Sequence, residues 1–313
     1  MSKLSQMRLG DERGQSLVFF VLFLFALVLM FALVVNVGSW LQAQRQAQSV
    51  ADAVALAVVQ ELPSSDLQSV ANSYANQNWP NFTSAGTVVL TSAGSSPGSA
   101  AIAVRASHPV PGFFGALTGI FGVTVSAHAT ARVQAPTALT AVTPLAVECS
   151  GGCTSWPFDE SVTFTWSSKR NAANTFSPMR LPGVSTSSFG TYIGCDARDP
   201  TAGNCLQNKD AVGSYRTLNI NIDTLATAVE GAAGVPHLVP VYNSLSGRGG
   251  NRRAQVVGWA AFTIENVVED TSSNSISLTG HFDKFFVDSS FLASKVEAGN
   301  NADFGVHAVG LID

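Results

Sequence analysis

A long uncharged stretch near the N-terminus constrains the fold of this chain more than any other feature. No charged side chain occurs from Gly14 to Gln44, and the run Leu17–Val37 is apolar throughout except for Asn36. At ~1.5 Å per residue, these 21 residues form a helix of roughly 32 Å, which matches the hydrocarbon thickness of a bilayer. We therefore predict a transmembrane helix over residues 14–40, preceded by a cytoplasmic N-terminus over residues 1–13. The lipid bilayer is the first partner that the sequence implies.

A cleaved secretory signal is the alternative interpretation of this run. Its apolar region is usually ~7–15 residues long and ends in a small-residue cleavage site. Here the run is longer and continues through Trp40 into a helical pattern, which favours a retained, single-pass anchor. We expect Arg13 and Trp40 at the two membrane interfaces. Because Lys3, Arg8 and Arg13 precede the span and only Arg45 follows it closely, the positive-inside rule predicts a cytoplasmic N-terminus and an outside C-terminal region.

The pattern beyond Trp40 predicts a long helix on a small antiparallel sheet over residues 41–135. The helical pattern continues to Leu62, rich in Ala, Gln and Leu, with no Gly or Pro before Pro63. A second helix is expected over residues 66–79, with Ser65 or Asp66 as its cap. Alternating residues then predict strands over 87–91, 101–106 and 123–134. Between the last two strands, residues 111–122 are expected to form a short helix or a turn.

Two segments resemble a known family. Arg-Gly-Gln precedes the apolar run, residues 48–57 read QSVADAVALA, and residues 113–133 read FFGALTGIFGVTVSAHATARV. These motifs resemble the N-terminal domain of the tight-adherence (Flp) pilus-assembly proteins of the TadE/TadG type, over about residues 13–135. The motif residues are Arg13, Gly14, Gln15, Asp52, Ala53, Ala55, Leu56 and Ala57.

The resemblance implies a pseudopilin-like part of a pilus or secretion machine in the cytoplasmic membrane of a bacterium. Its partners would be other Tad/Flp pilus-assembly membrane proteins, contacted through the N-terminal helix. Within the motif, Asp52 is interpreted as a solvated residue on the helix surface. Pairing between subunits is the alternative, because Arg45 lies two helical turns earlier on the same face.

The order Arg13-Gly14-Gln15 also raises the question of cleavage after the glycine, as in a pilin precursor. Such precursors carry a glutamate at the fifth mature position, and here that position is Phe19. A new N-terminal amine buried by polymerisation would lack its charge partner, at a cost of several kcal/mol. We therefore expect Gly14 to remain uncut at the inner edge of the anchor.

The remaining chain is expected to be a β-rich extracytoplasmic domain over residues 136–313. Prolines and threonines in residues 134–147 suggest a linker, and the segments after it read as turns and mostly antiparallel strands. One helix is expected over residues 221–231, capped by Asn221 or Asp223. The predicted fold class is therefore α+β: a transmembrane helix continuing into a pilin-like helix on a small sheet, then a mostly β domain.

Four cysteines follow the predicted span and would lie in an oxidising compartment. They permit three pairings, and we favour the local one, Cys149 with Cys153 and Cys195 with Cys205, because each pair brackets a turn-rich stretch. A zinc site is the alternative. The spacing Cys-x3-Cys followed by Cys-x9-Cys lacks the tight second knuckle typical of structural zinc sites.

The sequence shows no catalytic constellation. The five histidines are scattered without paired ligand spacing, and no nucleophile elbow or phosphate-binding loop is present. A net charge of −4, with no basic cluster on one element, argues against a nucleic-acid partner. We expect a non-enzymatic protein with no cofactor or metal, and no small-molecule substrate is identified. Two rivals stay open: a surface adhesin or ligand-binding module tethered by the helix, and a membrane-anchored hydrolase with an unrecognised site.

Overall fold

The computed structural model describes residues 15–62, 66–96, 99–149, 158, 160–167, 175–247, 251–288, 290 and 303–312. The chain divides into two compact units, one built mainly from residues before Thr130 and one mainly from residues after Ala129. Each unit is described by itself. The helices are α1 (Gln15–Gln60), α2 (Leu67–Asn78), α3 (Phe82–Ala85), α4 (Gly115–Thr118), α5 (Phe189–Ile193) and α6 (Ile222–Glu230).

The strands belong to three sheets. Their bounds are β1 (Thr87–Ser96), β2 (Ser99–Pro111), β3 (Gly122–Gln134), β4 (Ala138–Leu139), β5 (Leu145–Glu148), β6 (Val162–Ser167), β7 (Phe176–Arg180), β8 (Asp210–Ala211), β9 (Gly213–Thr217), β10 (Pro236–Ser246), β11 (Arg253–Asp270), β12 (Ser275–Asp283), β13 (Phe285–Val287) and β14 (Val306–Leu311). The expected α+β architecture, a long apolar helix followed by a mostly β region, is confirmed.

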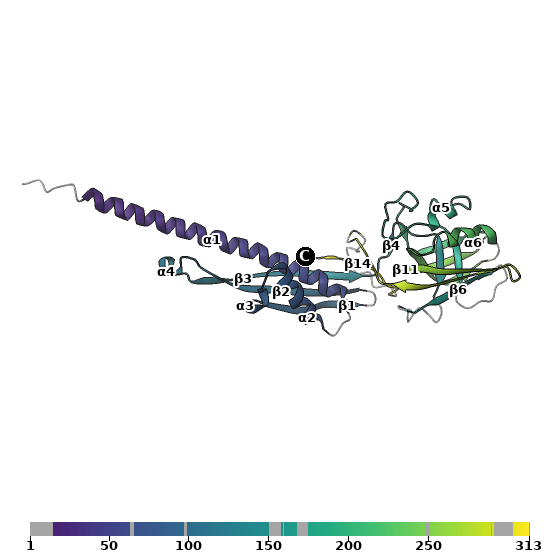
Figure 1. The fold of residues 1–313 in the computed structure, drawn as a ribbon, viewed down its shortest axis with the longest axis horizontal. Helices are drawn as coiled ribbons and strands as arrows, with labels where there is room; N and C mark the ends of the chain where they lie inside the picture. The colour runs from purple at the N-terminus through teal and green to yellow at the C-terminus, as the bar shows by residue number, and fades with distance from the viewer. Residues whose placement is uncertain are drawn as a thin grey trace, which may run out of the picture. The chain divides into compact units, whose positions relative to one another are not determined.

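Helix α1 is continuous for 46 residues (Figure 1). It ends at Gln60, two residues before the predicted Leu62, and Pro63 follows shortly afterwards. A proline ring clashes with the preceding turn, so the residues just before a proline tend to leave the helix. The second predicted helix is also present as α2, with Asp66 at its N-cap position.

The first sheet has the strand order β1-β2-β3-β14-β13. The longest predicted strand is confirmed as β3, and its alternate residues Val125, Ala127 and Ala129 are buried. Strand β14 pairs antiparallel with the end of β3, joining Ala308–Leu311 to Ala131–Gln134. This pairing could not be predicted from the sequence, since alternation in a strand does not identify its partner.

The second sheet has the order β10-β5-β7-β9-β11-β12-β6. Strand β10 also pairs with β11, so five of these strands close into a ring. The long strand β11 then continues into pairs with β12, which in turn pairs with β6. Most pairs are antiparallel, and the exception in this sheet is β10 with β5.

The core of the second unit combines the sheet with α6. Phe164, Phe262 and Phe282 form a cluster with ring centroids 4.8–5.8 Å apart. Helix α6 buries Leu225, Ala226 and Val229. Its predicted cap is confirmed, because the Asn221 side chain accepts a hydrogen bond from Thr224 N at 2.8 Å.

Five elements of this unit were not predicted: β4, β5, β7, β8 and α5. Strands β4 and β5 begin within residues 134–147, where Leu139, Leu145 and Val147 are buried, so the expectation of a linker there was wrong. Strand β8 has two residues, too few to show alternation. Strand β7 contains Pro178, a residue that cannot donate a ladder hydrogen bond and therefore lowers the strand signal. The five-residue helix α5 is too short to show a helical period, so the expectation of one helix in this region was wrong.

Candidate functional site

The second half of α1 carries a stripe of buried small residues. Ala47, Val50, Ala51, Val54 and Ala55 are fully buried, at spacings of three and four residues that place them on one helix face. Small side chains let a helix axis approach a packed surface closely. The stripe therefore fixes this half of α1 against the folded unit.

Two glutamines join α1 to β3 in the first unit. Gln44 Nε2 donates to Ser126 O at 2.7 Å, and Gln48 Nε2 donates to His128 O at 3.1 Å. The acceptors are two residues apart in β3 and the donors one turn apart in α1, so the helix follows the strand in register. Sequence reasoning did not identify Gln44, because a polar residue on a helix is usually solvated.

Asp52 acts within this arrangement. Besides its hydrogen bond to His128 O, Gln48 Nε2 donates one to Asp52 Oδ1 at 2.7 Å. Both amide hydrogens of Gln48 are therefore used. This contact orients the amide toward His128 O. The observed partner of Asp52 is therefore a glutamine of its own helix, which neither the solvated nor the intersubunit interpretation had named.

The first half of α1 is apolar and exposed. Most of its large side chains from Leu17 to Val37 show between 39% and 74% of their surface to solvent. Contact between so many apolar side chains and water would be unfavourable. A lipid environment explains why this surface is exposed. Helix α1 is the one described helix that is long and apolar enough to cross a membrane.

The comparison with protein families concerns this same helix. A family model described as putative Flp pilus-assembly TadE/G-like matches residues 14–61. This part of the chain is similar to that family. The match covers almost exclusively α1. Neither a curated protein nor a solved structure matches the chain.

The structure describes most of the motif residues in the matched segment. Arg13 and Gly14 lie outside the described residues, and Gln15 is the first residue of α1. Ala55 is buried, whereas Ala53, Leu56 and Ala57 are half-buried beside the stripe. Trp40 is half-buried and its Nε1 atom is excluded from solvent. Its position at a membrane interface stays a prediction.

Asn36 has a role that its position in the apolar run did not reveal. Its side chain is 1% exposed, and its Oδ1 accepts a hydrogen bond from Phe114 N at 3.3 Å. Phe114 lies in the connection between β2 and β3, just before α4. The sequence signal was present, because Asn36 is the one polar residue of the run, but its partner is 78 positions away.

Cys195 and Cys205 form a disulfide with their Cα atoms 4.9 Å apart. Their sulfurs are therefore not ligands of a zinc ion. Cys149 is buried in the core of the second unit. Its predicted partner Cys153 lies outside the described residues.

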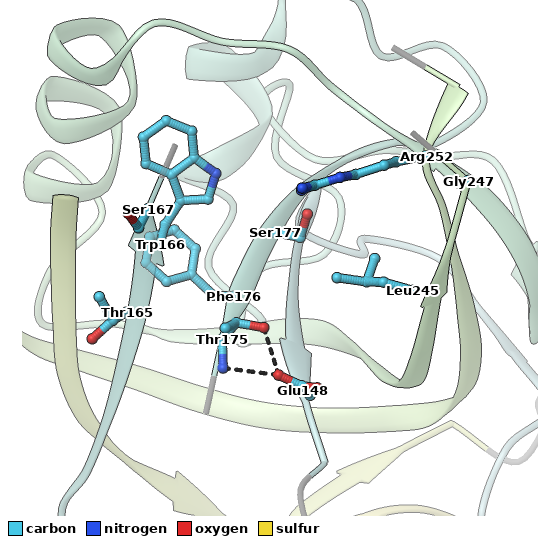
Figure 2. A pocket seen from close by; sticks show the side chains of 10 residues that line it. All are labelled: Glu148, Thr165, Trp166, Ser167, Thr175, Phe176, Ser177, Leu245, Gly247 and Arg252. Atoms are coloured by element: carbon cyan, nitrogen blue, oxygen red, sulfur yellow. Dashed lines mark hydrogen bonds between the residues drawn. The ribbon is translucent and has the colours of Figure 1, made fainter. Parts of the chain in front are cut away.

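The second unit contains a cavity of about 300 Å³ (Figure 2). Glu148 accepts hydrogen bonds from Thr175 N, at 3.1 Å, and from the Thr175 hydroxyl. Arg252 extends toward the side of the cavity where Trp166 lies. An aromatic ring, a guanidinium group and a carboxylate together suit a polar ligand with one apolar face.

Asp210 is a buried carboxyl group away from this cavity. It is 1% exposed, and neither carboxyl oxygen has a hydrogen-bond partner among the described residues. Burial raises its pKa to about 6. The folded protein therefore binds a proton here more tightly than the unfolded chain does.

We expect Asp210→Asn to stabilise the protein at pH 7.5 and to leave it unchanged at pH 4. Because the pKa of Asp210 is raised in the folded protein, this carboxyl group is protonated without penalty at pH 4. The wild-type protein then loses stability as the pH rises toward 6. Above pH 6, the free energy of unfolding of the variant is expected to exceed that of the wild type by about 3 kcal/mol. Melting of the detergent-solubilised chain from pH 4 to 7.5 measures it, with the exposed Glu230→Gln as control. A mutant-to-wild-type difference that is constant with pH would contradict this origin.

Proposed function

We propose that the protein is a single-pass, pseudopilin-like component of a Tad/Flp pilus-assembly or secretion system, structural and non-enzymatic. The observation that carries the proposal is the division of α1 into two halves. The half with exposed apolar residues is suited to lipid, and the half with the small-residue stripe packs on a folded unit. The TadE/G-like match spans both halves.

In this proposal the protein lies in the cytoplasmic membrane of a bacterium with its N-terminus in the cytoplasm. The excess of Lys and Arg before the span supports that orientation. The disulfide Cys195–Cys205 also supports it, because disulfides persist in compartments outside the reducing cytoplasm. The second unit would then face the outside.

The proposed mechanism is helix packing. Within a membrane, helices associate through van der Waals contacts and small residues, since lipid supplies no hydrophobic drive between them. The exposed face of α1 would contact the helices of other pilus-assembly proteins. The glutamine contacts to β3 would hold the helix at a constant position relative to its own sheet.

Membrane fractionation combined with pilus counts tests this proposal. We expect the intact protein to stay in the membrane pellet after alkaline extraction, since a spanning helix is not released by loss of peripheral contacts. Cells that lack the protein should lose Flp pili and regain them on complementation. A protein found in the soluble fraction, or normal pili in its absence, would overturn the proposal.

The cavity in the second unit favours one alternative, a surface adhesin or ligand-binding module tethered by α1. We expect Arg252→Ala to weaken cell adhesion while pili remain normal if this alternative holds. Arg253→Ala is the matched control, because Arg253 is the next residue but does not line the cavity. If the proposed structural role is correct, both variants keep wild-type adhesion and wild-type pili.

A further inference from the structure

The connection between β2 and β3 exposes an unusual concentration of large apolar side chains. We call residues 112–121 the aromatic tip. Phe113 and Phe121 are 71% and 74% exposed, and Phe114 and Ile120 are both 42% exposed. Between Arg105 and Arg132 the chain contains no Asp, Glu, Lys or Arg. Exposed apolar clusters of this kind mark contact with a partner or a membrane.

The aromatic tip is held in one shape by its backbone. Gly112 N donates to Phe121 O at 2.8 Å, and Gly119 N donates to Gly115 O at 2.8 Å. Gly119 has a φ of +73°, which a side chain would disfavour. A Cβ atom at Gly115 would lie 2.9 Å from the Phe121 Cα atom. The exposure of the phenylalanines therefore follows from a closely packed turn.

A hydrogen bond attaches the aromatic tip to α1 at a defined level. Phe114 N donates to Asn36 Oδ1, and Asn36 is the penultimate residue of the apolar run Leu17–Val37. One turn deeper in the run, Ala32 is 2% exposed, although its neighbour Phe31 is 74% exposed. The face of α1 that carries Asn36 is therefore buried over one more helical turn, from Asn36 back to Ala32.

From this geometry we propose that the aromatic tip inserts into the outward-facing leaflet of the membrane, beside α1, as a second point of membrane contact. The proposal rests on the proposed function in one respect, that α1 spans the bilayer. If it does, Asn36 lies at the boundary between acyl chains and headgroups, and the tip lies at the same level. Phe and Leu side chains on the apolar face of interfacial helices bury at this boundary, between headgroups and acyl chains.

Lipid is the occupant that the observations favour over another protein. The tip carries no charged group that would need a counter-charge on a partner, and its depth is fixed by a hydrogen bond within the same unit. Two membrane contacts, one through α1 and one through the tip, would restrict tilting of the unit relative to the membrane plane. A pilus component would then hold its folded unit at one constant inclination to the membrane.

The test uses an environment-sensitive fluorophore on the full chain reconstituted in vesicles of phosphatidylethanolamine and phosphatidylglycerol. Phe113→Cys and Phe121→Cys place the label on the tip, and both positions are exposed, so the fold should tolerate it. Phe25→Cys, in the middle of the apolar run, is the membrane reference, and Val89→Cys, exposed on β1, is the aqueous reference. The wild-type chain gives the background labelling.

We expect the labels at 113 and 121 to show blue-shifted emission and quenching by lipids spin-labelled near the headgroup. The label at 89 should show neither effect. The reference label at 25 is read with lipids spin-labelled deep in the acyl chain. Water-like emission at both tip positions, with the label at 25 quenched by these acyl-chain spin labels, would overturn the insertion but leave the anchor intact. Blue-shifted emission without lipid quenching would also overturn it, because a protein would then cover the tip. A label at 25 that the acyl-chain spin labels do not quench would overturn the membrane span and the proposed function with it.

Discussion

Replacing Val54 with aspartate is expected to detach α1 from the first unit while leaving the protein in the membrane. Val54 is fully buried in the small-residue stripe, and it lies far from the apolar run that would span the bilayer. The change removes apolar burial and places a carboxylate at a fully buried position, so we expect a loss of about 4 kcal/mol or more. That is a large fraction of the stability of an ordinary domain.

Limited proteolysis of membranes and pilus counts measure this effect. We expect faster cleavage after Trp40, unchanged alkaline resistance and loss of pili. Ser49→Asp is the matched control, because Ser49 is exposed and lies five residues before Val54 on another face of the same helix. If Val54→Asp cells keep normal pili and the protein keeps its protease resistance, the packed half of α1 is not needed for assembly.

The second large effect is expected from Gly280→Ala in the second unit. Gly280 pairs with Ile264, next to a β-bulge in β11 that lies between Ile264 and Asn266. A Cβ atom at Gly280 would collide with the Thr263 carbonyl oxygen and lie 2.8 Å from the Phe262 ring. Both obstacles belong to β11, so the strand itself has to move.

We expect a loss of about 3 kcal/mol, seen as a drop in Tm of roughly 5–10 °C for the solubilised full chain. Gly190→Ala is the control, because no atom lies within 4 Å of the position its Cβ would take. The control should melt at or slightly above the wild-type temperature, since alanine favours helix α5. Superimposable melting curves for Gly280→Ala and wild type would contradict this prediction. They would show that β11 moves to accommodate the added methyl group without a loss of stability.

The features that could be predicted from the sequence are those encoded by neighbouring residues. The apolar run and the small residues after it predicted α1, alternation predicted β3, and an asparagine before an apolar pattern predicted the start of α6. In each case the signal lies within one element, so a local period is sufficient.

The features that were missed depend on residues far apart in the chain. The contact of Asn36 with Phe114 joins positions 78 apart, and Gln44 meets Ser126 across 82 positions. A polar residue in a buried segment indicates that a hydrogen bond must form, because burial without one is costly. It does not indicate which distant backbone atom is the partner. The cavity lined by Glu148, Trp166 and Arg252 likewise combines strands that no local pattern brings together.

The pairing of β14 with β3 has a consequence for the order of events during synthesis and export. The β3 residues are made early, but the strand that covers their end is made only after the whole intervening β region. Pairings of such long range form slowly, and an uncovered strand edge can recruit other chains in the meantime. Gln44 and Gln48 already occupy the Ser126 and His128 carbonyls, and these two side chains emerge before β3 does. Helix α1 would thus shield part of the edge before β14 has been made.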